Sequence, residues 1–415
     1  MLKKISKYIL LFAKNIFYLI CSCFYRKDPS IVLFDSWFGQ KFSDNPRYLF
    51  QYLSENKNDL GLSHVVWVTR DEFINDKLNL MGYESYLINT NESIIFHKKA
   101  YYHICNNSPT TCQGFPGELL GQYSFRAIKI NLWHGTGAIK KLNMATNDYK
   151  MKISRHPVLY QIKQFVYSNS SVYRKIFVSS GGWEDCYFLT TSKTELDKLQ
   201  QCFPLPKEHF IISGYPRNTK QPRLLPFEED IVKCLTRYKR IILYLPTFRS
   251  GQTDFNFTEI SKKLAVLLEK KDILFIQKAH SADSHSDVPY KLEGNILNLN
   301  TNFDINILIP LVSVVMTDYS SVLADALYHY KPVILYVPDY EEYMTGDRGF
   351  SDDAEFLLSA GKKIYDITSL KCFLENYNFD DAKTDTYDEV RTRIWGEEKK
   401  NIEDIWQDML IQTRR

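Results

Sequence analysis

The segment NLWHGTGAIKKL, from Asn131 to Leu142, combines residue types that bind and transfer phosphate groups. Glycine permits sharp turns that expose backbone N–H groups, and an imidazole can hold or release a proton near neutral pH. The paired lysines Lys140 and Lys141 attract anions. Because His134 directly follows an apolar β-type run, we interpret the segment as a loop that meets a phosphate at the end of a strand.

Four further polar clusters each follow an apolar β-type run. SGYPRN follows residues 209–212, PTFR follows 240–245, KAH follows 273–277 and TDYSS follows 313–316. Each cluster alone is a weak signal, because turns and helix caps have the same composition. Ligands of parallel sheets bind beyond the carboxyl ends of the strands, so clusters at matching strand ends predict one shared site.

Two histidines differ from the others by their position. His134 follows a strand in the first half of the chain, and His280 follows one in the second half. One histidine after a strand is usually structural, but two at the strand ends of opposite domains would face each other across a cleft. We therefore predict that both are catalytic.

The segment TDYSSVLADAL has two interpretations. Thr317 or Asp318 would cap a helix that begins near Ser320, whether or not a ligand binds there. The N–H groups and hydroxyls at the same helix start would also receive a phosphate. We favour the phosphate site and keep the structural alternative open.

Short β-type runs alternate with helical stretches along most of the 415 residues, which is typical of parallel sheets covered by helices. This length predicts two domains, with a hinge near residue 205 where CFPLPKEH contains two prolines. We expect an α/β protein of two Rossmann-like domains that face each other across a cleft. The predicted strands cover residues 30–37, 64–69, 84–88, 101–105, 127–133, 174–180, 209–214, 240–247, 273–278, 313–317 and 331–337.

The N-terminal segment MLKKISKYILLFAKNIFYLICSCFYRKD is apolar but carries lysines before and within its apolar run. It lacks the cleavage site of a signal peptide and is marginal as a membrane span, which needs about 20 mostly apolar residues. A helix in the headgroup region of an anionic leaflet fits this pattern, and a buried helix of the first domain is the alternative. The eight cysteines include no CxxC pair, so they indicate a reduced, cytosolic interior without a zinc site.

The formal net charge of +3 is small, but the charges are unevenly distributed. Between Leu119 and Trp183 the only acidic residue is Asp148, among many basic and aromatic residues. This mixture is typical of binding to single-stranded nucleic acid, and also of binding to anionic headgroups or a polyanionic acceptor. The apolar N-terminus favours a membrane surface and no nucleic acid, and a solvated basic face is the structural alternative.

In their order along the chain, WHGTG with its lysines, SGYPRN, LPTFR, KAH, TDYSSVLADAL and PVILYVPDYEEY…RGF resemble the CDP-glycerol glycerophosphotransferase family of teichoic-acid and capsule biosynthesis. The resemblance covers about residues 30–380. It implies a GT-B-like fold and peripheral work at the cytoplasmic face of the membrane. It also implies transfer of glycerol phosphate or ribitol phosphate from CDP-glycerol or CDP-ribitol to a hydroxyl of a lipid-linked glycan or growing polymer, with release of CMP and no cofactor.

With this resemblance the chain divides into four predicted parts. Residues 1–27 form a membrane-interface helix, and 28–205 form an N-terminal Rossmann-like domain for the acceptor and the membrane. Residues 206–385 form a C-terminal Rossmann-like domain that binds the CDP-alditol, and 386–415 form a helix that packs back onto the first domain.

The family's two histidines correspond to His134 and His280, and its basic residue in the proline–threonine turn corresponds to Arg249. Gly137 stands where many members have proline, and Lys278 and Ala279 stand where many have arginine or proline, which leaves the acceptor and leaving-group contacts open. The predicted substrate-binding residues are Gly135, Thr136, Arg217, Thr247, Arg249, Lys278, Asp318, Ser320, Ser321, Asp325 and Arg348.

Phosphoryl transfer needs an activated hydroxyl, an in-line approach and positive groups around the leaving phosphate. We expect His134 to act as the base, while His280, Arg249 and the helix start at Ser320 hold the pyrophosphate and the departing CMP; reversed histidine roles stay open. No DxD-type carboxylate pair is placed for Mg²⁺, so no metal is predicted.

Two other functions compete with this one. A GT-B glycosyltransferase or epimerase that uses a UDP-sugar would share the cleft and the phosphate site, and a polyanion-binding or membrane-scaffolding protein would share the basic surface. Because the chain lacks the long N-terminal extension of the large polymerases, a primase or a compact capsule transferase fits as well as a polymerase. Glycerol or ribitol, the acceptor and the oligomeric state, including a homo-oligomer, are left open.

Overall fold

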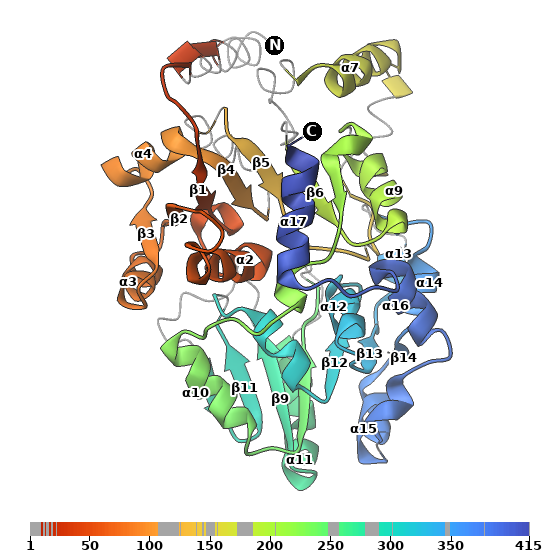
Figure 1. Cartoon of the computed structure of the whole chain (residues 1–415). Helices are drawn as coiled ribbons and strands as arrows, with labels where there is room; N and C mark the ends of the chain where they lie inside the picture. The colour runs from red at the N-terminus through yellow and green to blue at the C-terminus, as the bar shows by residue number, and fades with distance from the viewer. Residues whose placement is uncertain are drawn as a thin grey trace.

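The computed structural model describes most of the chain. It covers residues 10, 13, 16–17, 20–21, 23–106, 124, 126–137, 139–142, 145–146, 154–155, 157–171, 186–203, 205–247, 257–278, 290–300, 302–344, 349–376 and 378–414. Two sheets with helices around them occupy the upper and the lower half of the molecule in Figure 1. The prediction of two α/β sheets is confirmed.

The first sheet is entirely parallel, with the strand order β3-β2-β1-β4-β5-β6-β7. Helices cover both faces, so its central strands are continuous apolar runs such as Ile31–Phe34, which is fully buried. Its strands are β1 (Asp28–Phe34), β2 (His64–Thr69), β3 (Glu84–Leu87), β4 (Ala100–Cys105), β5 (Ile128–Asn131), β6 (Tyr187–Thr190) and β7 (Phe210–Ile212).

The second sheet has the order β10-β11-β9-β8-β12-β13-β14, and it is parallel except for the antiparallel edge strand β10. Strands β8, β12 and β13 at its centre are buried and point their carboxyl ends toward the first sheet. Its strands are β8 (Arg240–Tyr244), β9 (Ile273–Lys278), β10 (Tyr290–Glu293), β11 (Ile296–Leu299), β12 (Val314–Thr317), β13 (Val333–Tyr336) and β14 (Lys362–Ile364).

Helices connect and cover these strands. Two short 3-10 turns, η1 (Trp37–Gly39) and η5 (Pro216–Asn218), follow the carboxyl ends of β1 and β7 and lie at the site described below. The helices used here are α2 (Asp44–Glu55), α3 (Glu72–Leu80), α4 (Asn91–Lys99), α7 (Pro157–Asn169), α9 (Lys193–Cys202), α10 (Pro226–Leu235), α11 (Phe257–Lys270), α12 (Val322–Tyr328), α13 (Tyr340–Met344), α14 (Ala354–Leu358), α15 (Ile367–Glu375), α16 (Tyr387–Trp395) and α17 (Ile402–Thr413).

The prediction that strand 209–214 belongs with the second half is wrong. It forms β7 and pairs with β6 of the first sheet, where Phe188 lies opposite Phe210. The chain therefore crosses between the sheets after β7, through η5 and α10, rather than near residue 205. The short strands β6, β10, β11 and β14 were not predicted, and the predicted strand 174–180 lies outside the described residues.

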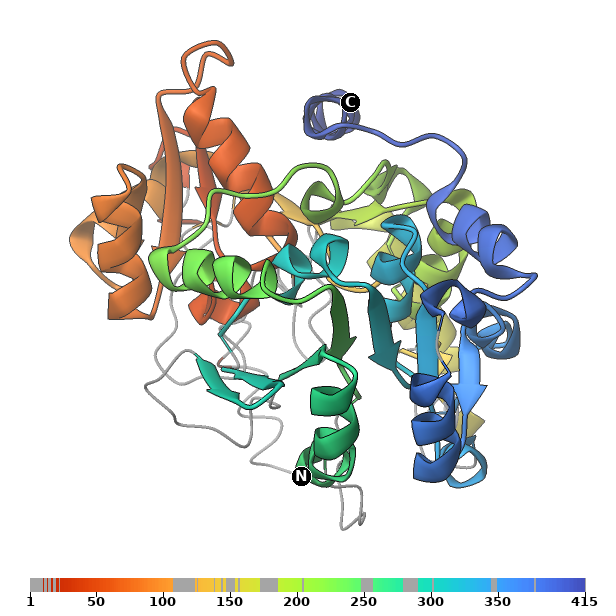
Figure 2. The same cartoon turned by 90° about the horizontal axis from the view of Figure 1, so that it is seen from below.

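The C-terminal segment predicted as one helix over 386–415 contains two helices, because Gly396 adopts a φ of 74° and ends α16. Helix α16 lies against α12 and α9, and α17 lies against β7 and α2. Figures 1 and 2 show α17 on the outside of the molecule, beside the first sheet. The buried indole of Trp395 donates to the carbonyl oxygen of Ala324 at 2.8 Å, so the end of α16 is tied to α12.

The structure describes only a few of the first 27 residues, and the membrane-interface helix stays a prediction. Within the described part of the chain, no helix is long and apolar enough to cross a membrane. Helix α7 lies at the top of Figure 1.

Candidate active site between the two sheets

A cavity of about 230 Å³ lies between the carboxyl ends of the two sheets. The loops after β1 and β5 line it from the first sheet, and the end of β9 and the start of α12 line it from the second. This is where the strand-end rule places a ligand. The charged and aromatic side chains around it are Trp37, Lys41, Asp44, His134, Arg217, Lys278, Phe303, Asp304 and Asp325.

His134 stands in this cavity three residues after β5. Its Nδ1 lies 2.8 Å from the backbone oxygen of Asn106. A carbonyl oxygen only accepts, so Nδ1 carries the proton and Nε2 keeps a lone pair. Burial lowers the pKa of His134 below its usual range, although the hydrogen bond to Asn106 opposes this shift. The imidazole is therefore neutral near pH 7 and suited to accept a proton.

The glycines beside His134 permit close contacts with other elements. A Cβ on Gly135 would lie 3.3 Å from the hydroxyl of Ser321, so this loop touches the start of α12. Gly137 has a φ of 61°, and a Cβ there would lie 2.9 Å from Ile394 on α16. Thr136 is buried and bonds Thr191 and Glu195, so its hydroxyl serves the contact with α9.

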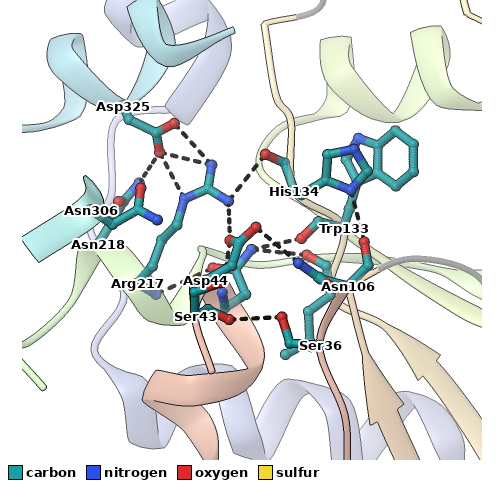
Figure 3. A network of polar contacts seen from close by, with 12 residues as sticks. Ser36, Ser43, Asp44, Asn106, Trp133, His134, Arg217, Asn218, Asn306 and Asp325 are labelled. Carbon is teal, nitrogen blue, oxygen red and sulfur yellow. Dashed lines mark hydrogen bonds and ion pairs between the residues drawn. The ribbon is translucent and has the colours of Figure 1, made fainter. Parts of the chain in front are cut away.

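Arg217 and Asp325 were both predicted to bind substrate, and both lie at the cavity. Their side chains form an ion pair with each other. The Nε and Nη2 atoms of Arg217 each donate to a carboxylate oxygen of Asp325 at 2.9 Å. Its Nη1 atom donates to Asp44 at 2.6 Å and to the backbone oxygen of His134 at 3.2 Å. Figure 3 shows this guanidinium between the three partners.

Thr247 and Asp318 also bond each other. The carboxylate of Asp318 accepts the hydroxyl of Thr247 at 2.6 Å and its backbone N–H at 2.9 Å. Asp318 therefore fixes the turn after β8, and Lys140 reaches the same threonine at 3.2 Å. Helix α12 begins at Val322 with Ser321 as N-cap residue, so the alternative that Thr317 or Asp318 caps it is wrong.

Two lysines bring positive charge to the cavity from opposite sheets. Lys278 at the end of β9 donates to the carbonyl oxygen of Phe303 at 2.6 Å. Burial, and next the neighbouring Lys41, lower the pKa of Lys278 to about 7. Burial also lowers the pKa of Lys41, which lies over the ring of Trp37. An anion in the cavity would relieve the repulsion between these two cations.

Sequence reasoning missed Trp37, Lys41, Asp44 and Asp304. The signal for the first two was available, because the strand-end rule applies to β1 as well. The predicted strand ran to residue 37, whereas β1 ends at Phe34, so the polar turn after it was read as strand. Trp37 and Phe38 adopt positive φ angles of 48° and 62°, which is uncommon for bulky residues and marks a constrained turn.

Three predicted site residues, His280, Arg249 and Arg348, lie outside the described residues. Within the described part, Ser320 and Ser321 line the cavity at the start of α12. Among the same described residues, no group of three or more histidine, cysteine or acidic side chains is placed to hold a metal ion.

Comparisons with known proteins agree with this architecture. The model of the CDP-glycerol:poly(glycerophosphate) glycerophosphotransferase family matches residues 16–401. The chain is 25% identical over 398 residues to a teichoic acid poly(glycerol phosphate) polymerase of Bacillus spizizenii, with 91% of each chain covered. It is 23% identical to a teichoic acid glycerol-phosphate transferase of Staphylococcus aureus, covering 79% of this chain and 78% of that one.

Solved structures show the same fold. The wall teichoic acid polymerase TagF aligns with a TM-score of 0.64 at 18% identity, covering 100% of this chain and 96% of that chain. A TagF variant soaked with CDPG aligns with a TM-score of 0.66. The fold is thus GT-B-like, and the chain belongs to the CDP-glycerol:poly(glycerophosphate) glycerophosphotransferase family.

Proposed function

We propose that this protein transfers glycerol phosphate or ribitol phosphate from a CDP-alditol to a hydroxyl of a lipid-linked acceptor in teichoic-acid synthesis, and releases CMP. The observation that carries this proposal is the shared cavity, which is lined by His134, whose Nε2 keeps a lone pair, and by the side chains of Lys41 and Lys278. The family match supports this transfer over the UDP-sugar alternative. A role in capsule synthesis stays a prediction.

In the proposed reaction the acceptor hydroxyl attacks the phosphorus that carries the alditol. Nε2 of His134 takes the hydroxyl proton, a new P–O bond forms, and the P–O bond to CMP breaks so that CMP leaves with the bridging oxygen. The negative charge on that oxygen needs fixed positive groups. Lys41, Lys278 and the N–H groups at the start of α12 are the described candidates, and His280 with Arg249 completes the predicted set.

The enzyme is proposed to need no divalent metal, because Lys41, Lys278 and the start of α12 line the cavity and could hold the phosphates in place of a metal ion. Activity in EDTA should equal activity in magnesium. Loss in EDTA with recovery on adding magnesium would contradict this proposal.

We also propose that the protein works peripherally on the cytoplasmic face of an anionic membrane. Helix α7 supports this, because Val158, Leu159, Ile162 and Phe165 are 67%, 65%, 57% and 70% exposed. Lys27, at the end of the N-terminal segment, lies near the basic residues Lys129 and Arg126, and burial followed by these two charges lowers its pKa to about 7. Anionic headgroups would stabilise the charged form of Lys27.

The function is tested by incubating the purified protein with CDP-glycerol, CDP-ribitol and several UDP-sugars, together with a lipid-linked acceptor. Release of CMP that depends on the acceptor is the expected result, and the preferred alditol identifies the donor. Release of UDP instead of CMP would favour the glycosyltransferase alternative. No nucleotide release from any donor would contradict the proposal.

A further inference from the structure

His134 belongs to a closed ring of hydrogen bonds that are buried or partly buried. Its Nδ1 donates to the backbone oxygen of Asn106 at 2.8 Å, and the side-chain amide of Asn106 donates to Asp44 at 3.0 Å. Asp44 accepts from Arg217 at 2.6 Å, and the same Nη1 atom of Arg217 donates to the backbone oxygen of His134 at 3.2 Å. The ring fixes both the backbone and the imidazole of His134 (Figure 3).

A second asparagine strengthens the same connection. The side-chain nitrogen of Asn45 donates to the carbonyl oxygens of Leu132 at 3.1 Å and Trp133 at 2.9 Å, directly before His134. Its side-chain oxygen accepts the backbone N–H of Arg217 at 3.2 Å. The start of α2 therefore holds the His134 loop and the η5 turn together.

Arg217 extends the ring into the second half of the molecule. Its remaining edge forms the two-pronged pair with Asp325 on α12, four residues after Ser321. Asp44 and Asp325 are each 5% exposed and Arg217 is 4% exposed. All three nitrogens of this guanidinium are engaged, so it is not arranged to receive a phosphate. Although burial opposes its charge, Asp325 and Asp44 raise the pKa of Arg217, which stays cationic at every working pH.

Asp44 has an unusual backbone that fits a functional role. It adopts a φ of 66° at the start of α2, in a region that non-glycine residues rarely occupy. Its backbone N–H donates to Asp304 at 3.0 Å, which ties this turn to the connection between β11 and β12 as well. Such conformations persist where the surroundings enforce them, and they concentrate at functional sites.

We propose that Asp44 and Arg217 are positioning residues, which hold His134 in its reactive tautomer and orientation and connect it to the helix that begins at the phosphate site. This assignment replaces the substrate-binding role predicted for Arg217 and adds Asp44. It rests on the proposed function, in which His134 is the base. The guanidinium of Arg217 bonds α12 through Asp325 and the His134 loop through its backbone oxygen. The proposed phosphate site at α12 and the proposed base His134 are therefore held in a fixed relative position.

The two positioning charges have opposite effects on His134. Asp44 raises the pKa of His134 and Arg217 lowers it. The base must be neutral, so activity falls below its pKa. Asp44→Asn should therefore move the acid limb of kcat/KM to lower pH, and Arg217→Gln should move it to higher pH. The other described charged groups that line this cavity, and that both variants retain, are Lys41, Lys278, Asp304 and Asp325.

The kinetic test compares both variants in CMP release from CDP-glycerol. Loss of positioning should lower kcat by about 10- to 100-fold and leave KM for CDP-glycerol within about twofold. Arg217→Lys should recover part of the lost rate, because it keeps the charge. A rise of about tenfold in the Kd of CDP-glycerol with an unchanged pH profile would instead show that Arg217 binds the donor.

Nuclear magnetic resonance of ¹⁵N-histidine protein tests the idea without turnover. The His134 signals, assigned with His134→Gln, should report an Nδ1–H tautomer in the unmodified protein and pKa changes of opposite sign in the two variants. Equal pKa values in all forms would overturn the proposal. Failure of the wild-type protein to use either CDP-glycerol or CDP-ribitol would contradict the proposed function, and the resonance measurement would still decide the positioning role.

A matched control is Glu228→Gln. Glu228 accepts two hydrogen bonds of 2.7 Å from Arg47, and this buried pair likewise joins α2 to the connection between the sheets. It does not contact His134. Glu228→Gln should lower the unfolding temperature and leave the acid limb of the kcat/KM profile at the same pH. If Glu228→Gln moves the acid limb as Asp44→Asn does, the shift reflects general destabilisation, and positioning by Asp44 is refuted.

If Arg217→Gln does not fold, the comparison is made with Asp44→Asn and Arg217→Lys alone.

Discussion

At the residue scale, His134 combines a fixed tautomer, a lowered pKa and a place beside two lysines. We expect His134→Ala to lower turnover by at least about a hundredfold without unfolding the protein, the usual scale for loss of a general base. His280→Ala should do the same, on the sequence prediction alone. CMP release and circular dichroism measure rate and fold, and near-normal release by either folded variant would remove that histidine from the mechanism.

Lys278 gives a pH prediction at the same scale. Its pKa of about 7 in the free protein should rise when the doubly negative pyrophosphate binds, so binding takes up a proton. Protonated Lys278 stabilises the complex with CDP-glycerol. This stabilisation is fully present below pH 7 and is lost as the pH rises, so CDP-glycerol binding should weaken by about tenfold between pH 6 and pH 8. Calorimetry in buffers of different ionisation enthalpy measures both effects.

Lys278→Met serves as the control for that measurement. It should bind CDP-glycerol more weakly at pH 6 and show almost no change in affinity up to pH 8. An unmodified protein whose affinity is flat over this range would show that Lys278 does not contact the pyrophosphate.

At the element scale, α7 presents an apolar face without a described covering. Each apolar side chain moved out of water contributes about 1.5–3 kcal/mol, so replacing Val158, Ile162 and Phe165 by serine should weaken liposome binding by at least about a hundredfold. Turnover on a soluble acceptor should change little. Sedimentation with anionic and neutral liposomes across a salt series separates the apolar contribution to liposome binding from the electrostatic contribution, which salt screens.

The matched control for α7 is Val266→Ser on α11. Val266 is 81% exposed, and α11 lies in the half of the molecule away from α7 in Figure 1. It should bind liposomes like the unmodified protein. Undiminished binding by the triple α7 variant would locate membrane attachment elsewhere, and deletion of residues 1–27 would then test the predicted N-terminal helix.

At the scale of the whole molecule, the C-terminal helices join the two halves. The ring of Trp395 packs on Tyr215 and Tyr328, and its Nε1 bonds Ala324. Trp395→Ala should cost about 3–5 kcal/mol of stability, and Trp395→Phe less, about 1–3 kcal/mol for the carbonyl left without a donor. The unfolding temperature should be highest for the unmodified protein, lower for Trp395→Phe and lowest for Trp395→Ala. Identical curves for all three proteins would show that α16 does not hold the halves together.

The sequence alone determined the chemical types at the site and the strands that carry them. Strand ends could be read because parallel strands covered by helices are continuous apolar runs, so polar clusters such as WHGTG and TDYSS stand out after them. Strands β6 and β14 were missed although β3 and β7, which are equally short, were predicted, so strand length alone does not explain the difference.

Only the tertiary structure decided which of those polar residues face a ligand and which face each other. Arg217, Asp325, Thr247 and Asp318 have the composition of a phosphate site, yet they form ion pairs and hydrogen bonds among themselves. Asp44 gave no signal, because its role depends on a positive φ and on partners 62 and 173 residues away. Contacts between elements so distant in sequence arise only when both sheets are packed, since no local pattern encodes them.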